Sequence, residues 1–583
     1  MTATTTRDAT KAPPRDAPIA GLTLADLDPA LDTLRASAQA WVATGPAERI
    51  RLLERVLRDS AAVGDRWAAA CIAAEGLDPT LPSSGEEALV GPTFFLRNVR
   101  LLRDALRDIE RHGVPRIPGA VRTRPDGQVT ARVFPISIYD RLFYPGITGE
   151  IWMEPGVTAA GLSGTQALAY RGGADPAGRI CLVLGAGNVS SIGPMDIISK
   201  LFVENSVVIF KLHPVNAYLG PILELGLRAL VERGVVRFMA GGADVGAALC
   251  GHPEVDEIHM TGSDRTYDAI VFGPGAEGQD RKTRDERRLH KPVTAELSNV
   301  SPVIVVPGQW SGADIASQAE NIATMLTNNG GFNCNAARVV ITHAGWSQRE
   351  QLLAAVRDRL GRTTPRVAYY PGAGARFDAF MAAHPEARQF GQRTDQRLPW
   401  AIIEGVDPER RDDICFTTES FCSVFAETAL QADSVAAFVD RAVTFANDTL
   451  WGSLNATVIV HPRTRREPAA GAAVERALAD LRYGTVSLNV WAALGFALGV
   501  LPWGAFPGNS PTAIESGVGN VHNTLMFAQV QKSVIRAPFR PLLKPVWYVS
   551  HRTAHRLAPR LSRFEASPSP VALPAIVALA MRG

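Results

Sequence analysis

Short apolar runs alternate with amphipathic stretches from residue 179 onward, and this alternation constrains the fold more than any other feature. "RICLVLGAGN" is a short apolar run that ends in glycines, and "SVVIFKL" is a second one. Between and after them, "GPMDIISKLFVEN" and "AYLGPILELGLRALVERGVV" have the apolar spacing of helices. Such alternation is typical of βαβ units, in which helices cover a parallel sheet. The sequence therefore predicts an α/β fold.

Length and composition narrow the class of protein further. A chain of 583 residues exceeds what one hydrophobic core supports, so several domains are expected. A net charge of +2 and the lack of a recognisable binding motif argue against a nucleic-acid partner. The uncharged stretch 483–514 is interrupted by Asn489, prolines and glycines, which predicts buried strands and turns and not a membrane-spanning helix.

The cysteines are scattered along the chain without a C-x-x-C pair. This pattern argues against a disulfide framework or a zinc knuckle, and for a reducing, cytoplasmic setting. Cys415 and Cys422 flank a β-like segment, and no histidine lies at liganding spacing from both, so buried packing is favoured and no metal site is predicted. The six are Cys71, Cys181, Cys250, Cys334, Cys415 and Cys422.

Cys334 stands apart because it lies in "NNGGFNCNAARVV", a turn of glycines and amides. A single cysteine is most often a small buried hydrophobic residue. A single glutamate such as Glu296 is usually a solvated surface charge. "GAGNVS" carries two glycines of a dinucleotide fingerprint but has Ser190 at the third position. Each of these three features is weak evidence by itself. The order and spacing in which they occur make them informative.

Taken together, these motifs resemble the aldehyde dehydrogenase superfamily, over roughly residues 150–531. "NNGGFNCNAAR" is similar to the family's cysteine motif, which puts Cys334 at the nucleophile position. "TAELSNVSP" is similar to the glutamate motif and puts Glu296 at the general-base position. The segment "LVLGAGNVSSIGPMDIISKLFVENSVVIFK" places Asn188 at the oxyanion position and Lys211 at the adenosine ribose, with the family's spacing between them.

Three further motifs follow in the family's order. "HMTGSDRTYDAI" resembles the F-T-G-S turn, which implies that Gly262 and Ser263 lie at the cofactor pyrophosphate. "FTTESFCSVF" resembles the E-I-F-G-P-V motif and implies that Glu419 and Phe421 contact the nicotinamide ribose and ring. "LPWGAFPGNS" is similar to the late P-F-G-G motif.

The resemblance also implies an organisation of the chain. We expect a Rossmann-type dinucleotide-binding domain, an α/β catalytic domain, a β-rich oligomerisation segment, and an active site between the first two. The β-rich segment combines residues near 130–155 with 485–530. The expected parts are a disordered tail at 1–21, N-terminal helices with the dinucleotide-binding domain at 22–293, the catalytic domain at 294–484, a segment at 485–531 that returns to the cofactor domain for oligomerisation, and a basic C-terminal extension at 532–583.

The residue types suit the oxidation of an aldehyde to a carboxylate with NAD or NADP. A thiolate attacks the carbonyl, hydride leaves to the nicotinamide, and the resulting thioester is hydrolysed. The Asn188 amide and the Cys334 backbone N–H are the candidate donors to the developing oxyanion. Glu296 is the candidate base for the hydrolytic water. Pro214 stands where many NAD-preferring relatives have a ribose-binding glutamate, so NADP is admitted as well as NAD.

Two departures keep alternatives open. Phe332 replaces a glutamine usual in the family, and Arg338 follows the cysteine one residue earlier than usual, as in the branch that makes or consumes acyl-CoA thioesters. An NADPH-dependent acyl-CoA reductase is therefore an alternative, although Glu296 favours hydrolysis. A second alternative is a non-catalytic homologue that binds lipid or protein.

The partners follow from the same reading. The apolar "VWAALGFALGVLPW" hints at an aliphatic or aromatic aldehyde, and the family implies a homodimer or homotetramer. Between Lys532 and Phe564 the chain has eight Lys or Arg residues, no acid, and the aromatic pair Trp547 and Tyr548. This run is interpreted either as a solvated basic face or as peripheral attachment to anionic lipid.

Overall fold

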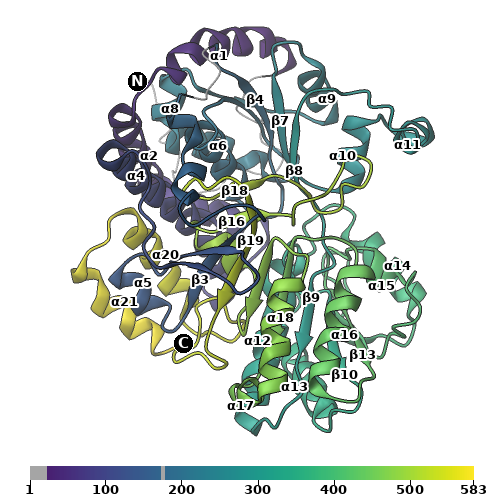
Figure 1. The fold of residues 1–583 in the computed structure, drawn as a ribbon. Helices are drawn as coiled ribbons and strands as arrows, with labels where there is room; N and C mark the ends of the chain where they lie inside the picture. Colours follow the sequence, from purple (N-terminus) through teal and green to yellow (C-terminus); the bar gives the residue numbers. More distant parts are fainter. Residues whose placement is uncertain (1–22, 173–176) are drawn as a thin grey trace, which may run out of the picture.

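The computed structural model describes residues 23–172 and 177–583. The predicted disordered tail, 1–21, lies outside the described residues. Two sheets organise the molecule, one above the other in Figure 1, and each is covered by helices on its faces. The predicted α/β fold is confirmed. Among the described helices, none is both long and apolar enough to cross a bilayer.

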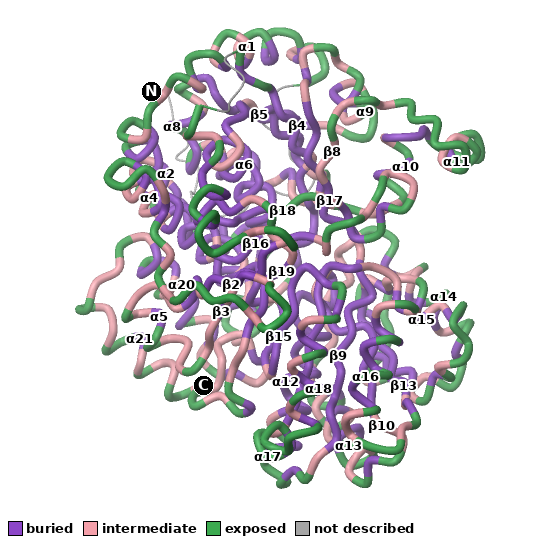
Figure 2. Tube along the Cα trace, viewed as in Figure 1, coloured by how far each residue is buried: buried purple, intermediate pink, exposed green. Residues whose placement is uncertain are grey.

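The upper sheet has six strands in the order β17-β8-β7-β4-β5-β6. Five of them run parallel, and β17 pairs antiparallel with β8. Its strands are buried along most of their length, as expected for a parallel sheet with helices on both faces (Figure 2). The bounds are β4 (Ile180–Leu184), β5 (Val207–Lys211), β6 (Val236–Met239), β7 (Glu257–Thr261), β8 (Val293–Glu296) and β17 (Gly517–Val518).

Helices that precede the sheet in sequence, and helices that connect its strands, cover its faces. The helix predicted from "RNVRLLRDALRDIERHGV" is α4, and it ends at Gly113, whose φ of 78° is the left-handed conformation of a helix C-cap. Trp41 of α1 and Phe202 of α6 pack edge to face, 5.3 Å between ring centroids. The principal helices are α1 (Leu27–Val42), α2 (Pro46–Ala74), α4 (Phe94–His112), α6 (Ile192–Phe202), α9 (Ala243–Gly251), α10 (Asp264–Val271) and α11 (Gly275–Thr283).

The lower sheet has eleven strands in the order β1-β2-β3-β19-β15-β14-β9-β10-β13-β12-β11. Its strands are β1 (Val121–Thr123), β2 (Val129–Phe134), β3 (Thr148–Met153), β9 (Pro302–Val305), β10 (Val339–His343), β11 (Arg388–Phe390), β12 (Trp400–Ile403), β13 (Val424–Leu430), β14 (Asn455–Ile459), β15 (Thr485–Leu488) and β19 (Val530–Arg536). Its helices include α12 (Gly312–Thr327), α13 (Arg349–Gly361), α14 (Ala373–Ala383), α16 (Val435–Asp448) and α18 (Pro468–Asp480).

The β-rich segment expected for subunit contact pairs inside the chain. β19 is parallel to β15 and antiparallel to β3, so its hydrogen-bonding edges are both used in the lower sheet. The segment 485–531 is predicted to return to the cofactor domain. Its first strand, β15, instead belongs to the lower sheet, and β17 is the strand of this segment that joins the upper sheet. The oligomeric state stays a prediction.

The C-terminal extension is folded onto the N-terminal helices. It contains α20 (Ala554–Ala566), the short helix η8 (Pro570–Ala572) and α21 (Leu573–Ala580). Buried ion pairs fix α20: the Arg97 guanidinium lies 3.0 Å from Glu565 and 2.9 Å from Asp140, and Arg100 also pairs with Glu565. Both carboxylate partners, Glu565 and Asp140, are buried, and loss of one of them leaves an arginine charge unpaired.

We expect Glu565→Gln to lower the free energy of unfolding by about 3 kcal/mol or more, because it strands the Arg100 guanidinium in a buried site. Urea unfolding followed by circular dichroism measures the change. The matched control is Arg563→Ala on the same helix, which breaks the exposed pair with Asp65 and should cost less than about 1 kcal/mol. Equal losses in the two variants would contradict the structural role of Glu565.

Candidate active site

The predicted site residues meet where the carboxyl ends of the upper strands face the amino ends of the lower strands. Asn188 follows β4, Lys211 ends β5, and Glu296 ends β8. Cys334 precedes β10, and the loop with Glu419 and Phe421 precedes β13. The carboxyl edge of a parallel sheet is the usual place for ligands in α/β folds.

The turn before Cys334 requires its glycines. Asn329, Gly330 and Gly331 have φ values of 51°, 63° and 83°, three consecutive residues in the left-handed region. A Cβ atom on Gly331 would lie 2.3 Å from the carbonyl oxygen of Cys422, so no side chain fits there. The turn is therefore packed directly against the loop that carries Phe421.

The Cys334 thiol donates a hydrogen bond to Glu296, 3.1 Å from Sγ to Oε1. Burial raises the pKa of Glu296, and the nearby Trp503 indole and the hydrogen bond from the thiol oppose the rise. Burial also raises the pKa of Cys334 well above its usual value, and the charge of Glu296 adds to the rise. The raised thiol pKa keeps Cys334 protonated at rest, beside the buried carboxyl group of Glu296. Oε2 of Glu296 has no hydrogen-bond partner among the described residues.

The Asn188 side chain reaches the same turn. Its amide donates to the carbonyl of Phe332, 2.9 Å away, which leaves its second N–H for another acceptor. Two contacts hold the backbone of Asn188: its carbonyl accepts from the Asn329 amide at 2.8 Å and from the Tyr369 hydroxyl at 2.9 Å. The structure thus brings Asn188, Glu296 and Cys334 together, as predicted.

Arg338 holds the Cys334 turn through hydrogen bonds. Its guanidinium is buried and donates to the Gly331 carbonyl at 2.6 Å, the Cys422 carbonyl at 3.0 Å and the Ser420 hydroxyl at 3.0 Å. These bonds join the Cys334 turn to the loop before β13. The sequence marked Arg338 only as a shift in spacing, and nothing in the sequence indicated these partners.

The residues predicted for the dinucleotide surround the same edge. Lys211 is buried at the end of β5, and burial lowers its pKa. Ser263 caps α10, accepting from the Thr266 N–H at 3.2 Å, and Gly262 is exposed beside it. Burial raises the pKa of Glu419 to about 7, opposed by the Arg338 charge, and its Oε1 atom has no partner among the described residues.

Two residues to which the sequence assigned no role, His213 and Tyr370, complete this region. His213 lies over Gly187, where a Cβ atom would be 2.3 Å from its Nδ1, so the backbone approach needs glycine. Tyr370 stacks on His213 with 6.0 Å between centroids and meets Phe421 edge to face at 4.9 Å. Tyr370 therefore spans the two halves of the molecule. Its only trace in the sequence is an unremarkable aromatic pair in "AYYPG".

A dinucleotide fits these groups chemically. Lys211 and the N-terminus of α10 offer positive charge and N–H donors to phosphate. The partnerless carboxylate oxygen of Glu419 can accept from ribose hydroxyls, and the Phe421 ring offers an apolar face.

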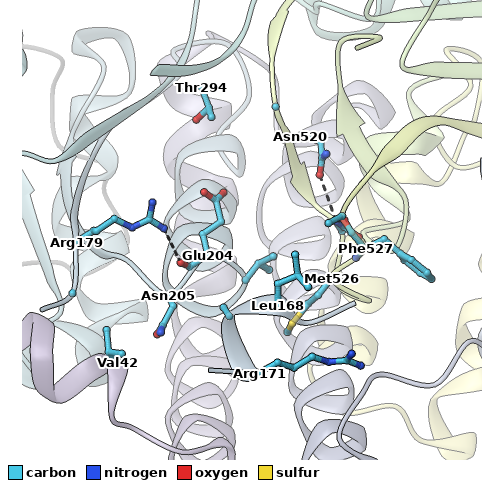
Figure 3. A pocket seen from close by; sticks show the side chains of 16 residues that line it. Val42, Leu168, Arg171, Arg179, Glu204, Asn205, Thr294, Asn520, Met526 and Phe527 are labelled. Carbon is cyan, nitrogen blue, oxygen red and sulfur yellow. Dashed lines mark hydrogen bonds between the residues drawn. The ribbon is translucent and has the colours of Figure 1, made fainter. Parts of the chain in front are cut away.

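Two other features lie away from this edge. A cavity of about 790 Å³ opens at the amino ends of β4 and β5, beside Arg179 and Glu204, and none of the predicted site residues lines it (Figure 3). The fold also brings His384 to Asp413, 2.9 Å apart, with Cys415 beside them; the separation of the two in sequence hid this histidine. Asp413 already accepts from His384 and from the Cys415 N–H, which accounts for the cluster as a capped helix start.

Comparison with known proteins agrees with the geometry. The profile of the Aldehyde dehydrogenase family matches residues 188–365, a range that includes Asn188, Glu296 and Cys334. Over this segment the chain is similar to the aldehyde dehydrogenase family. N-succinylglutamate 5-semialdehyde dehydrogenase of Sphingopyxis alaskensis is 30% identical over 166 residues, which cover 28% of this chain and 31% of the relative. Aldehyde dehydrogenase LUC3 of Fusarium is 27% identical over 161 residues, or 27% and 32% of the two chains. The chain spans about a third of the length of these curated relatives.

Solved aldehyde dehydrogenases share the fold over most of the chain. An indole-3-acetaldehyde dehydrogenase crystallised with NAD+ aligns at a TM-score of 0.57 and 18% identity, covering 88% of this chain and 89% of the other. The NADP-dependent glyceraldehyde-3-phosphate dehydrogenase of Bacillus halodurans, crystallised with NADP, gives 0.58 and 16%, covering 88% and 91%. At these identities the likeness concerns the fold.

The thiol–carboxylate contact predicts how Cys334 reacts with iodoacetamide. Ionising the thiol beside the Glu296 carboxylate places two negative charges 3.1 Å apart, so Glu296→Gln should lower the thiol pKa and speed alkylation near neutral pH. Alkylation rate against pH, read by mass spectrometry, measures the shift. The five buried cysteines serve as an internal reference. A midpoint that moves to higher pH would show instead that Glu296 promotes thiolate formation.

Proposed function

We propose that this protein oxidises an aldehyde to a carboxylate with NAD or NADP. The observation that carries the proposal is the hydrogen bond from the Cys334 thiol to Glu296, with the Asn188 amide beside the same turn. The similarity of residues 188–365 to the Aldehyde dehydrogenase family supports it.

Each residue has a role that follows from its position. The Cys334 thiol loses its proton to solvent, and the thiolate forms a thiohemiacetal with the aldehyde carbon. The free N–H of the Asn188 amide and the Cys334 backbone N–H stabilise the oxyanion; one such donor is typically worth about 3–4 kcal/mol. Lys211, Ser263, Glu419 and Phe421 would hold NAD or NADP, whose oxidised nicotinamide would supply the hydride acceptor when bound.

The second half-reaction needs a base near the thioester on Cys334. Glu296 is buried, its pKa is raised, and its Oε2 atom is free to accept a hydrogen bond from water. As a carboxylate, Glu296 can deprotonate the water that attacks the thioester carbonyl, and the departing Cys334 thiolate takes that proton back. The products are then the free thiol and a carboxylate.

The substrate side favours an apolar aldehyde. The segment "VWAALGFALGVLPW" forms buried structure next to the site, including α19 (Leu494–Ala497) and β16 (Pro502–Gly504). The Trp491 indole donates to the carbonyl of Asn335 at 2.6 Å, directly after Cys334. The Trp503 indole also lies beside Glu296. Two indoles at the reacting pair suit an aliphatic or aromatic chain.

Glu296→Gln separates hydrolysis from acyl transfer. The amide keeps the shape and loses the basicity, so steady-state turnover should fall about a hundredfold to ten-thousandfold. The first turnover should still release reduced cofactor as a burst, because the thioester accumulates. Stopped-flow absorbance of the reduced nicotinamide records both phases.

The controls decide between the mechanisms. Cys334→Ala should give neither burst nor turnover while dinucleotide binding, followed by fluorescence titration, is retained. If the wild type needs coenzyme A for sustained turnover and yields acyl-CoA, hydrolysis is wrong and acyl transfer is the reaction. Loss of the burst in Glu296→Gln would assign Glu296 to activation of the thiol.

The region after Lys211 predicts weak discrimination between NAD and NADP. Pro214 cannot accept a hydrogen bond, and burial beside Lys211 lowers the pKa of His213 to about 4, so His213 is neutral at pH 7. The carboxylate that acts on Lys211 is Asp244 of α9. We expect kcat/KM to favour NAD by less than about a thousandfold, or roughly 4 kcal/mol.

Asp244→Asn should shift the preference further toward NADP, because it removes a negative charge near the ribose end of the site. Glu224→Gln, in the neighbouring helix α7 (Gly220–Gly226), is the matched control. Steady-state kinetics with both cofactors test the expectation. A stronger NAD preference that survives Asp244→Asn would show that another group enforces it.

A further inference from the structure

We propose that the C-terminal helices form a docking surface for an anionic lipid bilayer. The surface consists of α21 with its flanks, the outer face of α5 (Ile138–Phe143), the loop 537–553, and the outer face of α20. It lies at the margin of the molecule, away from the junction of the two sheets (Figure 1).

The first observation is an apolar helix with little to cover it. α21 has the sequence LPAIVALA, and Ile576 is its one buried residue. The flanking side chains Val571 and Met581 are 86% and 70% exposed. A helix that is apolar all round is normally buried in a core or in lipid, so exposure of α21 needs an explanation.

The neighbouring segments expose apolar side chains as well. Ile138 and Leu142, one helical turn apart on α5, are 75% and 45% exposed, and Leu542 and Leu543 of the loop are 82% and 40% exposed. Together with Val571 and Met581 they are six of the eleven large apolar side chains that the described residues expose. More than half of the exposed apolar groups thus belong to this one surface.

These segments adjoin one another. Tyr139 and Phe143, on the inner face of α5, each pack on Phe564 of α20 with 5.1 Å between centroids. Tyr144 stacks on Trp547 of the loop at 6.5 Å. The Thr553 hydroxyl donates to the Leu579 carbonyl of α21 at 2.7 Å. The apolar groups therefore belong to one packed unit, and Figure 2 shows α5, α20 and α21 on the same side of the molecule.

The second observation is the charge beside this apolar surface. Four exposed arginines recur every three or four residues: Arg552 just before α20, and Arg556, Arg560 and Arg563 within it. Arg563 pairs with Asp65; the other three have no carboxylate within ion-pair distance in the described part of the chain. Residues 537–583 contain a single acid, Glu565, and it is buried against Arg97 and Arg100.

Exposed apolar side chains together with unpaired arginines favour an anionic lipid bilayer as the partner. α21 is only eight residues, about 12 Å, so it cannot span a bilayer but can lie in its interface. Apolar side chains inserted among headgroups, with unpaired arginines beside them, give the two signals that stable attachment requires. An anionic headgroup supplies the counter-charge that the protein itself does not offer these arginines.

The structure also corrects which residues of the basic run contribute. Lys532 and Arg536 lie in β19: Lys532 is buried, and Arg536 pairs with Glu475. Tyr548 is buried and Trp547 packs against Tyr144, so neither serves as the interfacial anchor that the sequence suggested. The aliphatic groups of α5 and α21 take that place.

Vesicle flotation of the full chain tests the proposal. Phosphatidylcholine vesicles are compared with vesicles that also contain phosphatidylglycerol, at low and high salt. We expect binding to the anionic vesicles only, weakening as salt rises. Val571→Asp with Met581→Asp should abolish it. Arg556→Gln with Arg560→Gln should weaken it about 25-fold, since one arginine near the surface contributes about fivefold.

Matched controls lie elsewhere on the surface. Leu81→Asp replaces an exposed apolar residue, and Arg284→Gln with Arg287→Gln removes two exposed arginines after α11. Both should bind vesicles like the wild type. Thermal unfolding checks that every variant is folded, and turnover of a short water-soluble aldehyde should be unchanged in all of them. A chain that proves inactive on aldehydes leaves the vesicle result standing, so the two proposals fail separately.

Three outcomes overturn the docking surface. The wild type fails to float with anionic vesicles, it floats equally with neutral ones, or the Val571 and Met581 variant binds as well as the wild type. In the last case, loss of binding in the arginine variant alone would mean simple adsorption of a basic surface. If the surface binds an acidic protein and not lipid, the wild type will fail to float with anionic vesicles, which is the first outcome.

Discussion

The hydrogen bond between Cys334 and Glu296 links the two sheets at the point where chemistry is proposed. Glu296 is the last residue of β8 in the upper sheet, and Cys334 lies in the turn before β10 in the lower one. The bond is short enough to couple the two groups electrostatically, so neither has an independent protonation state. A shift of one sheet against the other would separate them, and the rest of the site can be understood as what prevents that shift.

Three sets of buried contacts hold the turn that presents Cys334. Arg338 fixes it from the lower sheet through backbone carbonyls; burial lowers the pKa of Arg338, and the Glu419 charge opposes this. Asn188 fixes it from the upper sheet by its amide on Phe332. The left-handed glycines let the chain pass against the Cys422 carbonyl. A nucleophile positioned by backbone contacts on all sides is preorganised for attack.

The parts of this site that the sequence predicted are those carried by local patterns. Cys334, Glu296 and Asn188 each sit in a short motif at a strand end, and βαβ alternation places strand ends at one edge of a sheet. The partners that the fold brings from a distance were not predictable in this way. Tyr369 bonds to Asn188, and His384 to Asp413, through contacts that no sequence spacing encodes. Composition likewise suggested a uniform basic tail, yet Lys532 belongs to a buried strand because tertiary pairing overrides local charge.

The C-terminal extension also reaches the catalytic turn by direct packing. α20 lies so close to the helix α3 (Gly85–Ala88) that a Cβ atom on Gly85 would meet the Ala554 backbone at 2.4 Å. From the same short helix, Glu86 accepts a hydrogen bond from the Asn329 N–H at 3.0 Å, inside the turn that presents Cys334. The following turn, η3 (Leu89–Thr93), accepts from Ser191 just after Asn188. The extension therefore packs against α3, and α3 and η3 in turn contact the segments that carry Asn188 and Cys334. The surface proposed to bind lipid is thus connected to the candidate active site by direct packing.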